Sequence, residues 1–200
     1  MPDFQWLEGG ITAVPGLLAS GLAGGIKPSG KKDLALIYSS SPARAAAVFT
    51  TNQVKGAPVL VSQEHVRDGR AQAILASSGC SNVCTGEQGT KDAREMTRIT
   101  GELLRIPPRQ VLIASTGVIG QPLPMDKIRA ALPKLVKGLS PQGGRLAAEA
   151  IMTTDTVPKA FSKRIRLSSG EARVTGIAKG AGMIRPDMAT MLAFIATDAG

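Results

Sequence analysis

The spacing of apolar and polar positions along the chain predicts strands that alternate with helices. Short apolar runs typical of strands occupy residues 34–38, 45–49, 71–75 and 110–114. A helical period recurs over residues 87–105, between Asp126 and Gly138, and over 141–152. Two more strands, 160–167 and 172–178, flank turn-forming residues and predict a hairpin. The apolar run 188–196 predicts a central strand.

Residues at the ends of these segments support the boundaries. Thr85 and Gln88 form the pattern of a capping box, and Asp126 is placed to cap the next helix. The small residues 39–42 predict a turn, and 77–82 predict a loop. Because several strands are joined by hairpins, the pattern favours a mixed, layered α/β fold over a doubly wound parallel sheet.

The composition indicates a globular chain. Of the 200 residues, 43% are hydrophobic and 20% are charged, which excludes disorder and collagen-like repeats. With 4 Phe, 1 Trp and 1 Tyr, the core must consist of aliphatic side chains. The length suits one domain or half of a larger layered enzyme.

No segment predicts a membrane span or a secretion signal. The longest uncharged stretch, 9–26, is rich in glycine and contains Pro15, and the N-terminus lacks a basic region followed by an apolar run. The two cysteines, Cys80 and Cys84, form no disulfide framework. We therefore expect a cytoplasmic protein that does not associate with membranes.

The formal net charge of +9 raises the alternative of a basic nucleic-acid-binding module. Such a module would bind in a strongly salt-dependent way. However, the basic residues are scattered along the chain, and the scarcity of aromatic residues leaves no platform for base stacking. We expect a solvated basic face and no nucleic-acid partner.

The sequence argues against a P-loop, a redox cysteine pair, a metal site and a histidine-activated nucleophile. The stretch 25–32 resembles a P-loop, but Lys32 stands where a Ser or Thr must hold magnesium, so a flexible hairpin loop is expected. The spacing of Cys80 and Cys84 is not that of a redox pair. His65 is the single histidine, which leaves no metal site and no histidine base for a nucleophile.

Three segments rich in glycine and small hydroxyl residues remain. Residues 115–120 follow a strand, where backbone N–H groups can converge as an oxyanion hole. Residues 153–156 read Thr-Thr-Asp-Thr, and residues 179–192 carry a lysine, a glycine-rich loop and a threonine before an apolar run. Each has an ordinary structural explanation, because threonine favours strands and small residues favour turns.

The third segment resembles the ornithine acetyltransferase family, the bifunctional glutamate N-acetyltransferases of arginine biosynthesis. The family signature Lys-Gly-x-Gly-Met-x-x-Pro-x-Met-Ala-Thr-Met-Leu is matched over residues 179–192. Residues 49–52, 115–120 and 153–156 match further family motifs in the same order. The resemblance implies a layered α-β-β-α sandwich. It also implies that residues 1–200 are one domain portion, the α chain of a self-cleaving precursor whose C-terminal β chain is mostly absent.

In this family the precursor cuts itself between the Ala and Thr of the signature, here Ala189 and Thr190. The freed α-amino group of Thr190, with a pKa of roughly 7.7–8.0, would act as base for its own hydroxyl. The resemblance implies ping-pong transfer of an acetyl group from N-acetylornithine to glutamate through an acetyl-Thr190 ester. It leaves open whether acetyl-CoA is also a donor, and it implies no metal or other cofactor.

By resemblance, Thr116 and Gly117 form the oxyanion hole, and Lys179 and Thr190 bind substrate. In the segment 153–156, Thr153 is the expected substrate contact, with Thr156 next. The implied partner is the C-terminal β chain of the same precursor, in an α/β heterotetramer or larger assembly.

The chain departs from the family at residues 79–86. The family pattern is Gly-Asn-Ala-Asn-Ala-x-Thr-Gly, whereas Cys80 here replaces the first Asn and Asn82 keeps the second. We expect this change to alter substrate contacts or loop packing, but not the nucleophile.

A second enzyme class stays open beside the transferase. A self-processing aminopeptidase or amidase of the related layered fold would use a Ser nucleophile. The Thr at position 190 favours the transferase, and hydrolysis of peptide amides faster than acetyl transfer would favour the amidase.

Overall fold

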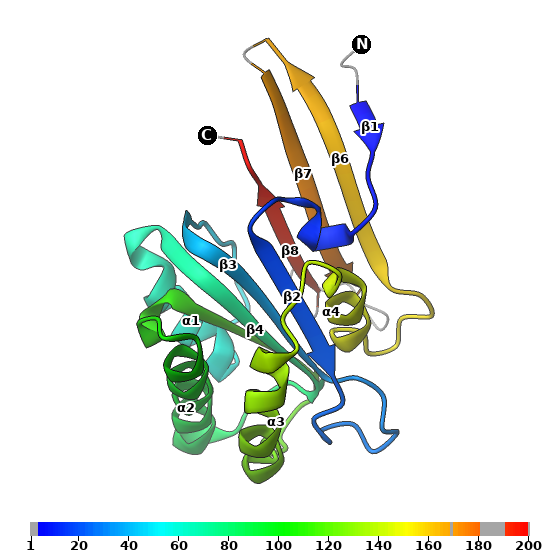
Figure 1. Ribbon diagram of the computed structural model, residues 1–200. Coiled ribbons are helices and arrows are strands. Elements are labelled where there is room, and N and C mark those ends of the chain that lie inside the picture. The colour runs from blue at the N-terminus through cyan, green and yellow to red at the C-terminus, as the bar shows by residue number, and fades with distance from the viewer. Residues whose placement is uncertain (1–3, 169, 181–190, 200) are drawn as a thin grey trace.

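The computed structural model describes residues 4–168, 170–180 and 191–199. Their strands form two four-stranded sheets (Figure 1). The first sheet has the order β2-β3-β4-β5 and consists of Leu17–Leu22, Leu34–Arg44, Arg70–Cys80 and Val111–Val118. The second sheet has the order β1-β6-β7-β8 and consists of Phe4–Trp6, Lys159–Leu167, Gly170–Lys179 and Leu192–Thr197.

One pair of the neighbouring strands that the structure describes is parallel, and the others are antiparallel. All neighbours in the second sheet are antiparallel. In the first sheet β2-β3 and β3-β4 are antiparallel, but β4 and β5 are parallel. The crossover between β4 and β5 contains helix α2, Gly86–Leu104. The carboxyl ends of β4 and β5 therefore meet at one edge of the sheet.

Helices and the second sheet cover opposite faces of the first sheet. Helices α1 (Ala57–His65), α2 and α3 (Met125–Lys137) lie on one face, as Figure 1 shows. Helix α4 (Gly144–Ala150) packs against β2 and β3 and also contacts β7. The expected mixed, layered α/β fold is confirmed, and the described residues supply three of the four expected layers.

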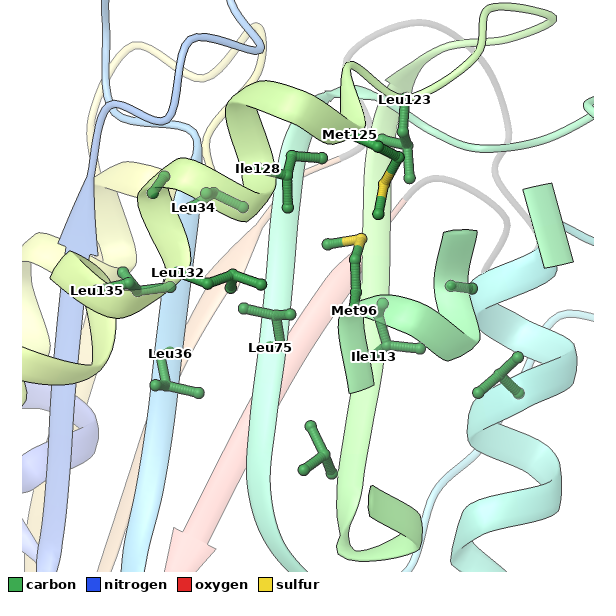
Figure 2. Packing of buried hydrophobic residues seen from close by; sticks show 14 of the residues in the cluster. Leu34, Leu36, Leu75, Met96, Ile113, Leu123, Met125, Ile128, Leu132 and Leu135 are labelled. Atoms are coloured by element: carbon green, nitrogen blue, oxygen red, sulfur yellow. The ribbon is translucent and has the colours of Figure 1, made fainter. Parts of the chain in front are cut away.

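The apolar core between the helices and the first sheet is aliphatic, as the composition predicts. Leu36, Leu75 and Ile113 point from the strands towards Met96 of α2 and Leu132 of α3 (Figure 2). All five side chains are buried. Burying a side chain of this size contributes about 1.5–3 kcal/mol relative to leaving it exposed, so this layer anchors the helices to the sheet.

A second core fills the space between the two sheets with small side chains. It consists of Ile11, Ala19, Ala35, Ile37, Ala76, Ala147, Ala148, Ala150, Ile151 and Ile177. Alanine side chains let the elements approach closely, which explains why the chain folds with so few aromatic residues.

The other face of the second sheet carries exposed apolar side chains. Phe4, Trp6, Phe161 and Ile195 lie on this outer face by the strand register, with Trp6 62% and Ile195 68% exposed. The Lys163 ammonium lies 3.9 Å from the ring centre of Phe4 and 4.3 Å from that of Trp6. Within the described ranges no helix covers this face.

Several strand predictions were wrong. The predicted turn at 39–42 is part of β3, and the predicted strand 45–49 is absent. The β3–β4 register shifts between Tyr38 and Ala43, so Pro42 falls where the ladder is interrupted and its missing N–H costs no ladder bond. The predicted loop 77–82 is wrong as far as Cys80, because β4 continues to that residue beside β5.

The helices were predicted better than their ends. Helix α2 and the 160–178 hairpin are confirmed, but helix α1 lacks a strong apolar period and is not predicted. The capping box is wrong, since the Thr85 hydroxyl donates to Asn82 Oδ1 (2.6 Å) and Gln88 Nε2 donates to Asp92 (2.7 Å). Asp126 is not a cap but lies inside α3, paired with Arg129 at 2.8 Å.

The strand predicted over 188–196 is present as β8, Leu192–Thr197, and residues 188–190 lie outside the described residues. Among the described strands β8 lies at an edge of its sheet, so the predicted central position is wrong for this part of the chain. Among the helices that the structure describes, none has the length and apolar character needed to cross a bilayer.

Candidate functional site

Hydroxyl side chains gather where the parallel strands β4 and β5 end. Ser77 pairs with Ser115 and Ser78 pairs with Thr116 along this ladder. The Oγ atoms of Ser77 and Ser115 share a hydrogen bond of 2.7 Å. Two strands that enter the site in parallel thus bring two hydroxyl-rich segments, 115–120 and 77–80, to one edge.

Gly117 is required at this edge for two physical reasons. Its φ of 135° lies in a region that side chains rarely adopt, and a Cβ at this position would collide with the backbone of Gly79. Thr116 is 6% exposed, whereas Gly117 is exposed. The backbone of Gly117 is therefore open to a ligand while Thr116 is held in place, which is compatible with the oxyanion-hole role expected for the pair.

Lys179 connects the second sheet to this edge. It is the last residue of β7 and is 3% exposed. Its Nζ donates a hydrogen bond of 3.3 Å to Thr116 Oγ1. Burial lowers the pKa of Lys179 and the Asp155 carboxylate opposes this, while the Lys159 ammonium lowers the pKa further. A buried ammonium group beside an exposed backbone suits a ligand with a negative charge.

The Asp155 carboxylate holds two segments of the site together. Oδ2 accepts a hydrogen bond from the N–H of Thr153 (3.2 Å), and Oδ1 accepts one from the N–H of Gly180 (2.9 Å). Lys159 Nζ also donates to Oδ1 at 2.6 Å. Burial alone would raise the pKa of Asp155, but these three donors outweigh it and lower the pKa to about 2. The carboxylate is therefore ionised at neutral pH.

The loop between β2 and β3 contacts Met152, the residue before Thr153. The buried Asp33 carboxylate accepts hydrogen bonds from the N–H groups of Ile26 (2.7 Å) and Lys27 (3.0 Å). Lys27 Nζ donates to the carbonyl groups of Lys32 (2.6 Å) and Met152 (2.7 Å). The loop is a hairpin connection, as predicted from its failure to match a P-loop, but these bonds anchor it rather than leave it flexible.

The predicted site residues fall into three groups. Thr116, Gly117, Thr153 and Lys179 come together through the contacts described above. Thr156, the second choice in its segment, is exposed. Ala189 and Thr190 lie outside the described residues. Leu192, two residues after Thr190 in the sequence, pairs with Lys179 in the β7–β8 ladder.

The departure at residues 79–86 affects packing. Cys80 is buried, its Sγ donates to the carbonyl of Gln121 (3.2 Å), and burial raises the pKa of this thiol. The retained Asn82 is also buried, and its amide donates to the carbonyl of Gly89 at 2.8 Å. Asn82 therefore supports the first turn of α2, while Cys80 contacts the segment that follows β5.

The remaining polar residues considered from the sequence do not join this site. His65 is half-buried, and its Nδ1 lies 2.9 Å from the carbonyl of Val111, at the opposite end of β5 from Thr116. In the described part of the chain, no group of His, Cys, Asp and Glu side chains has the arrangement of a metal site.

Asp155 and Lys27 are the residues that sequence reasoning missed. The sequence pattern draws attention to the threonines on either side of Asp155. The one sequence feature that could have indicated Asp155 is the presence of an acidic residue among the threonines of 153–156. Nothing in the local sequence of Lys27 indicates its contact with Met152, because 125 positions separate the two residues.

Comparisons with known proteins show the family of the chain. A model of the ArgJ family matches residues 18–200. The chain belongs to the ArgJ family. The arginine biosynthesis bifunctional protein ArgJ of Symbiobacterium thermophilum is 50% identical over 197 residues, 98% of this chain and 49% of the relative. That of Gloeobacter violaceus is 50% identical over 199 residues, with 99% and 49% covered. The chain spans about half the length of these relatives.

Solved structures show the same fold in this family. The arginine biosynthesis bifunctional protein ArgJ of Bacillus halodurans superposes with a TM-score of 0.85 at 38% identity, over 96% of this chain and 100% of the solved chain. The ornithine acetyltransferase of Mycobacterium tuberculosis, solved in complex with ornithine, has a TM-score of 0.84 at 39% identity, over 95% and 100%.

A more distant neighbour shares the fold alone. The L-aminopeptidase D-Ala-esterase/amidase of Ochrobactrum anthropi, described as a variant of the Ntn hydrolase fold, has a TM-score of 0.52 at 12% identity, over 95% of this chain and 63% of that one. The layered architecture of this ArgJ family member is thus also found in an enzyme with another activity.

Proposed function

We propose that the full-length protein is an ornithine acetyltransferase, which transfers an acetyl group from N-acetylornithine to glutamate in arginine biosynthesis. The observation that supports it most is the contact between Lys179 and Thr116, which joins two family motifs at the end of β5. The names of the related ArgJ proteins and the ornithine complex of the Mycobacterium tuberculosis relative support the substrate class.

The proposed reaction begins with self-cleavage. The Thr190 hydroxyl oxygen attacks the carbonyl carbon of Ala189, and the peptide bond is replaced by an ester between the two residues. Water then hydrolyses the ester, which leaves a carboxylate on Ala189 and a free α-amino group on Thr190. Ala189 has a small side chain that does not hinder the attack.

The freed α-amino group then serves as the base in place of a histidine. It accepts the proton of the Thr190 hydroxyl while the oxygen attacks the acetyl carbonyl of N-acetylornithine. Thr116 and Gly117 stabilise the negative charge that develops on the carbonyl oxygen, an effect for which one donor contributes about 3 kcal/mol. The protonated amine passes its proton to the leaving ornithine nitrogen, and the acetyl group remains on Thr190 as an ester.

The second half of the cycle reverses the first with another amine. The α-amino nitrogen of glutamate attacks the acetyl-Thr190 carbonyl, N-acetylglutamate leaves, and the threonine hydroxyl is restored. N-acetylornithine and N-acetylglutamate both carry a carboxylate on the α-carbon that bears the acetylated nitrogen. We assign Lys179 to that carboxylate, since a buried ammonium group pairs well with a charged oxygen, and Thr153 to a second substrate contact.

The proposed assembly includes the rest of the precursor. The exposed apolar face of the second sheet, with Trp6 and Ile195, supports a covering layer supplied by the C-terminal half, as does the half-length match to relatives. We propose an α/β heterotetramer or larger in the cytoplasm, where the thiols of Cys80 and Cys84, both free in the structure, would stay reduced. The proposed cycle needs no metal or organic cofactor.

The decisive experiment uses the full-length precursor and a Thr190→Ala variant. Intact-mass spectrometry should give two fragments that meet at Ala189/Thr190 in the wild type and one uncut chain in the variant. The processed protein should move a labelled acetyl group from N-acetylornithine to glutamate, and a parallel reaction with acetyl-CoA decides whether it is a second donor. An uncut wild-type chain, or hydrolysis of peptide amides faster than transfer, would overturn the proposal.

A further inference from the structure

The Asp155 carboxylate contacts Thr153, Gly180 and Lys159, but the proposed function gives Asp155 itself no role. It follows α4 and precedes β6, and its side chain is 4% exposed. One carboxylate oxygen binds the N–H of Thr153 and the other binds the N–H of Gly180, at 3.2 and 2.9 Å. We call this pair of bonds the Asp155 clasp.

The clasp links the two substrate segments of the proposed function directly. Thr153 is one expected substrate contact, and Gly180 follows Lys179, the other, in the chain. The two N–H groups are 27 positions apart in sequence, so no local turn brings them together. Because the side chain of Asp155 is largely buried, the loss of one carboxylate oxygen removes the acceptor of one of these two N–H groups.

Lys159 does not account for the position of Asp155. Its Nζ lies 2.6 Å from Oδ1, but its side chain is 49% exposed. An ion pair made by a solvent-exposed side chain contributes little to stability. The bonds from the two backbone N–H groups are charge-assisted, because their acceptor is ionised, and so belong to the strong class of hydrogen bonds. They also fix the backbone of both segments, which the flexible Lys159 side chain cannot do.

We propose that Asp155 is a positioning residue for the substrate site, and that its clasp fixes the spacing between Thr153 and Lys179. The inference rests on the proposed acetyl transfer. Asp155 touches neither substrate nor the reacting atoms; it acts through the two backbone segments. A misplacement of about 1 Å in a site of this kind costs about 100-fold in rate.

The test compares variants in the full-length, processed protein. Asp155→Asn keeps the shape but has one acceptor oxygen, so one of the two N–H groups faces an amide NH₂. Lys159→Met removes the ion pair and leaves the clasp intact. Asp198→Asn is the matched control, since Asp198 accepts the N–H of Arg173 (2.6 Å) and contacts its guanidinium group (3.5 Å) at the other end of β7.

Two readouts are measured on every variant. Hydrogen exchange reports protection of the Thr153 and Gly180 amides, which a hydrogen bond slows. Steady-state kinetics separate kcat from KM for N-acetylornithine and glutamate. We expect Asp155→Asn to lose protection at one or both amides and to lower kcat/KM by about 100-fold, chiefly through KM. Lys159→Met and Asp198→Asn should stay within about 3-fold of wild type.

The outcomes separate this inference from the proposed function. Wild-type protein without acetyl transfer overturns the function, while the exchange data still decide whether the clasp exists. Asp155→Asn with wild-type protection and KM overturns the inference, as does Lys159→Met with an equal loss. If Asp155→Asn does not fold, Asp155→Glu takes its place, because the additional methylene moves the carboxylate away from its position between the two N–H groups. Wild-type behaviour of that variant also overturns the inference.

Discussion

Lys179 Nζ lies 3.3 Å from Thr116 Oγ1, and this contact joins the last residue of β7 to the end of β5 in the other sheet. The ammonium group proposed to bind the substrate carboxylate therefore touches the segment proposed to stabilise the oxyanion. Binding and bond-making would share one rigid frame, since both residues lie on strands rather than on loops.

Lys179→Met should weaken substrate binding in the full-length protein. The methionine keeps the apolar stem but removes the charge, and hydrogen bonds to charged groups contribute about 1.5–3 kcal/mol. KM for N-acetylornithine and glutamate should therefore rise about 10- to 100-fold. Steady-state kinetics check this, with Lys134→Met on the exposed face of α3 as control. Equal KM values in the two variants would remove Lys179 from the binding site.

Acetyl transfer should decline on the alkaline side at a pH below 10.5, the ordinary value for a lysine. Burial lowers the pKa of Lys179, Asp155 opposes this, and Lys159 adds to the lowering, so the ammonium group loses its proton earlier than usual. Lys159→Met should move this decline to higher pH, because it removes the neighbouring positive charge. A profile of kcat/KM from pH 7 to 11 tests both statements. An unchanged decline in the variant would contradict this account.

Gly117→Ala should damage the oxyanion segment far more than Gly120→Ala. Both glycines have positive φ, 135° and 78°, so both substitutions carry backbone strain of about 1–3 kcal/mol. Only Gly117 has a neighbouring backbone, that of Gly79, that an added Cβ would strike, whereas nothing lies within 4 Å at Gly120. We expect kcat to fall about 100-fold in Gly117→Ala and to change little in Gly120→Ala. Similar kcat values in the two would show that the close approach is irrelevant.

Asp155 should contribute stability that disappears in acid. Its pKa is lowered from 3.8 to about 2 in the folded protein, since the bonds from Lys159, Gly180 and Thr153 outweigh the effect of burial. A lowered folded pKa gives a contribution that is complete above about pH 4 and is lost as the pH falls towards 2. The difference in Tm between wild type and Asp155→Asn should therefore shrink over that range. A constant difference would contradict the assigned pKa.

The elements that the sequence predicts best are those in which one local pattern decides the structure. The apolar period over α2 and the turn residues between β6 and β7 are such cases. The failures need long-range information. Pro42 fits within β3 because the β3–β4 ladder is interrupted there. Thr85 does not cap α2 because its hydroxyl donates a hydrogen bond to Asn82. Both outcomes depend on neighbours that no local rule contains.

The candidate site shows the same division. The motifs around Thr116, Thr153 and Lys179 are visible in the sequence because resemblance to the family marks them. The residues that hold them, Asp155 and Lys27, act on backbone atoms, and a bond to a backbone N–H or carbonyl leaves no trace in the identity of the partner residue. Such contacts become apparent only when the strands are placed in space.

The β7–β8 ladder has a consequence for the two products of the proposed cut. The cut would precede β8 by two residues, so the six-residue strand Leu192–Thr197 would pass to the second polypeptide while still paired with β7 from Val174 to Lys179. Breaking the peptide bond would thus divide the molecule covalently without dividing the sheet. The two fragments would remain joined by the main-chain hydrogen bonds between β7 and β8. The first fragment alone would expose the unpaired edge of β7.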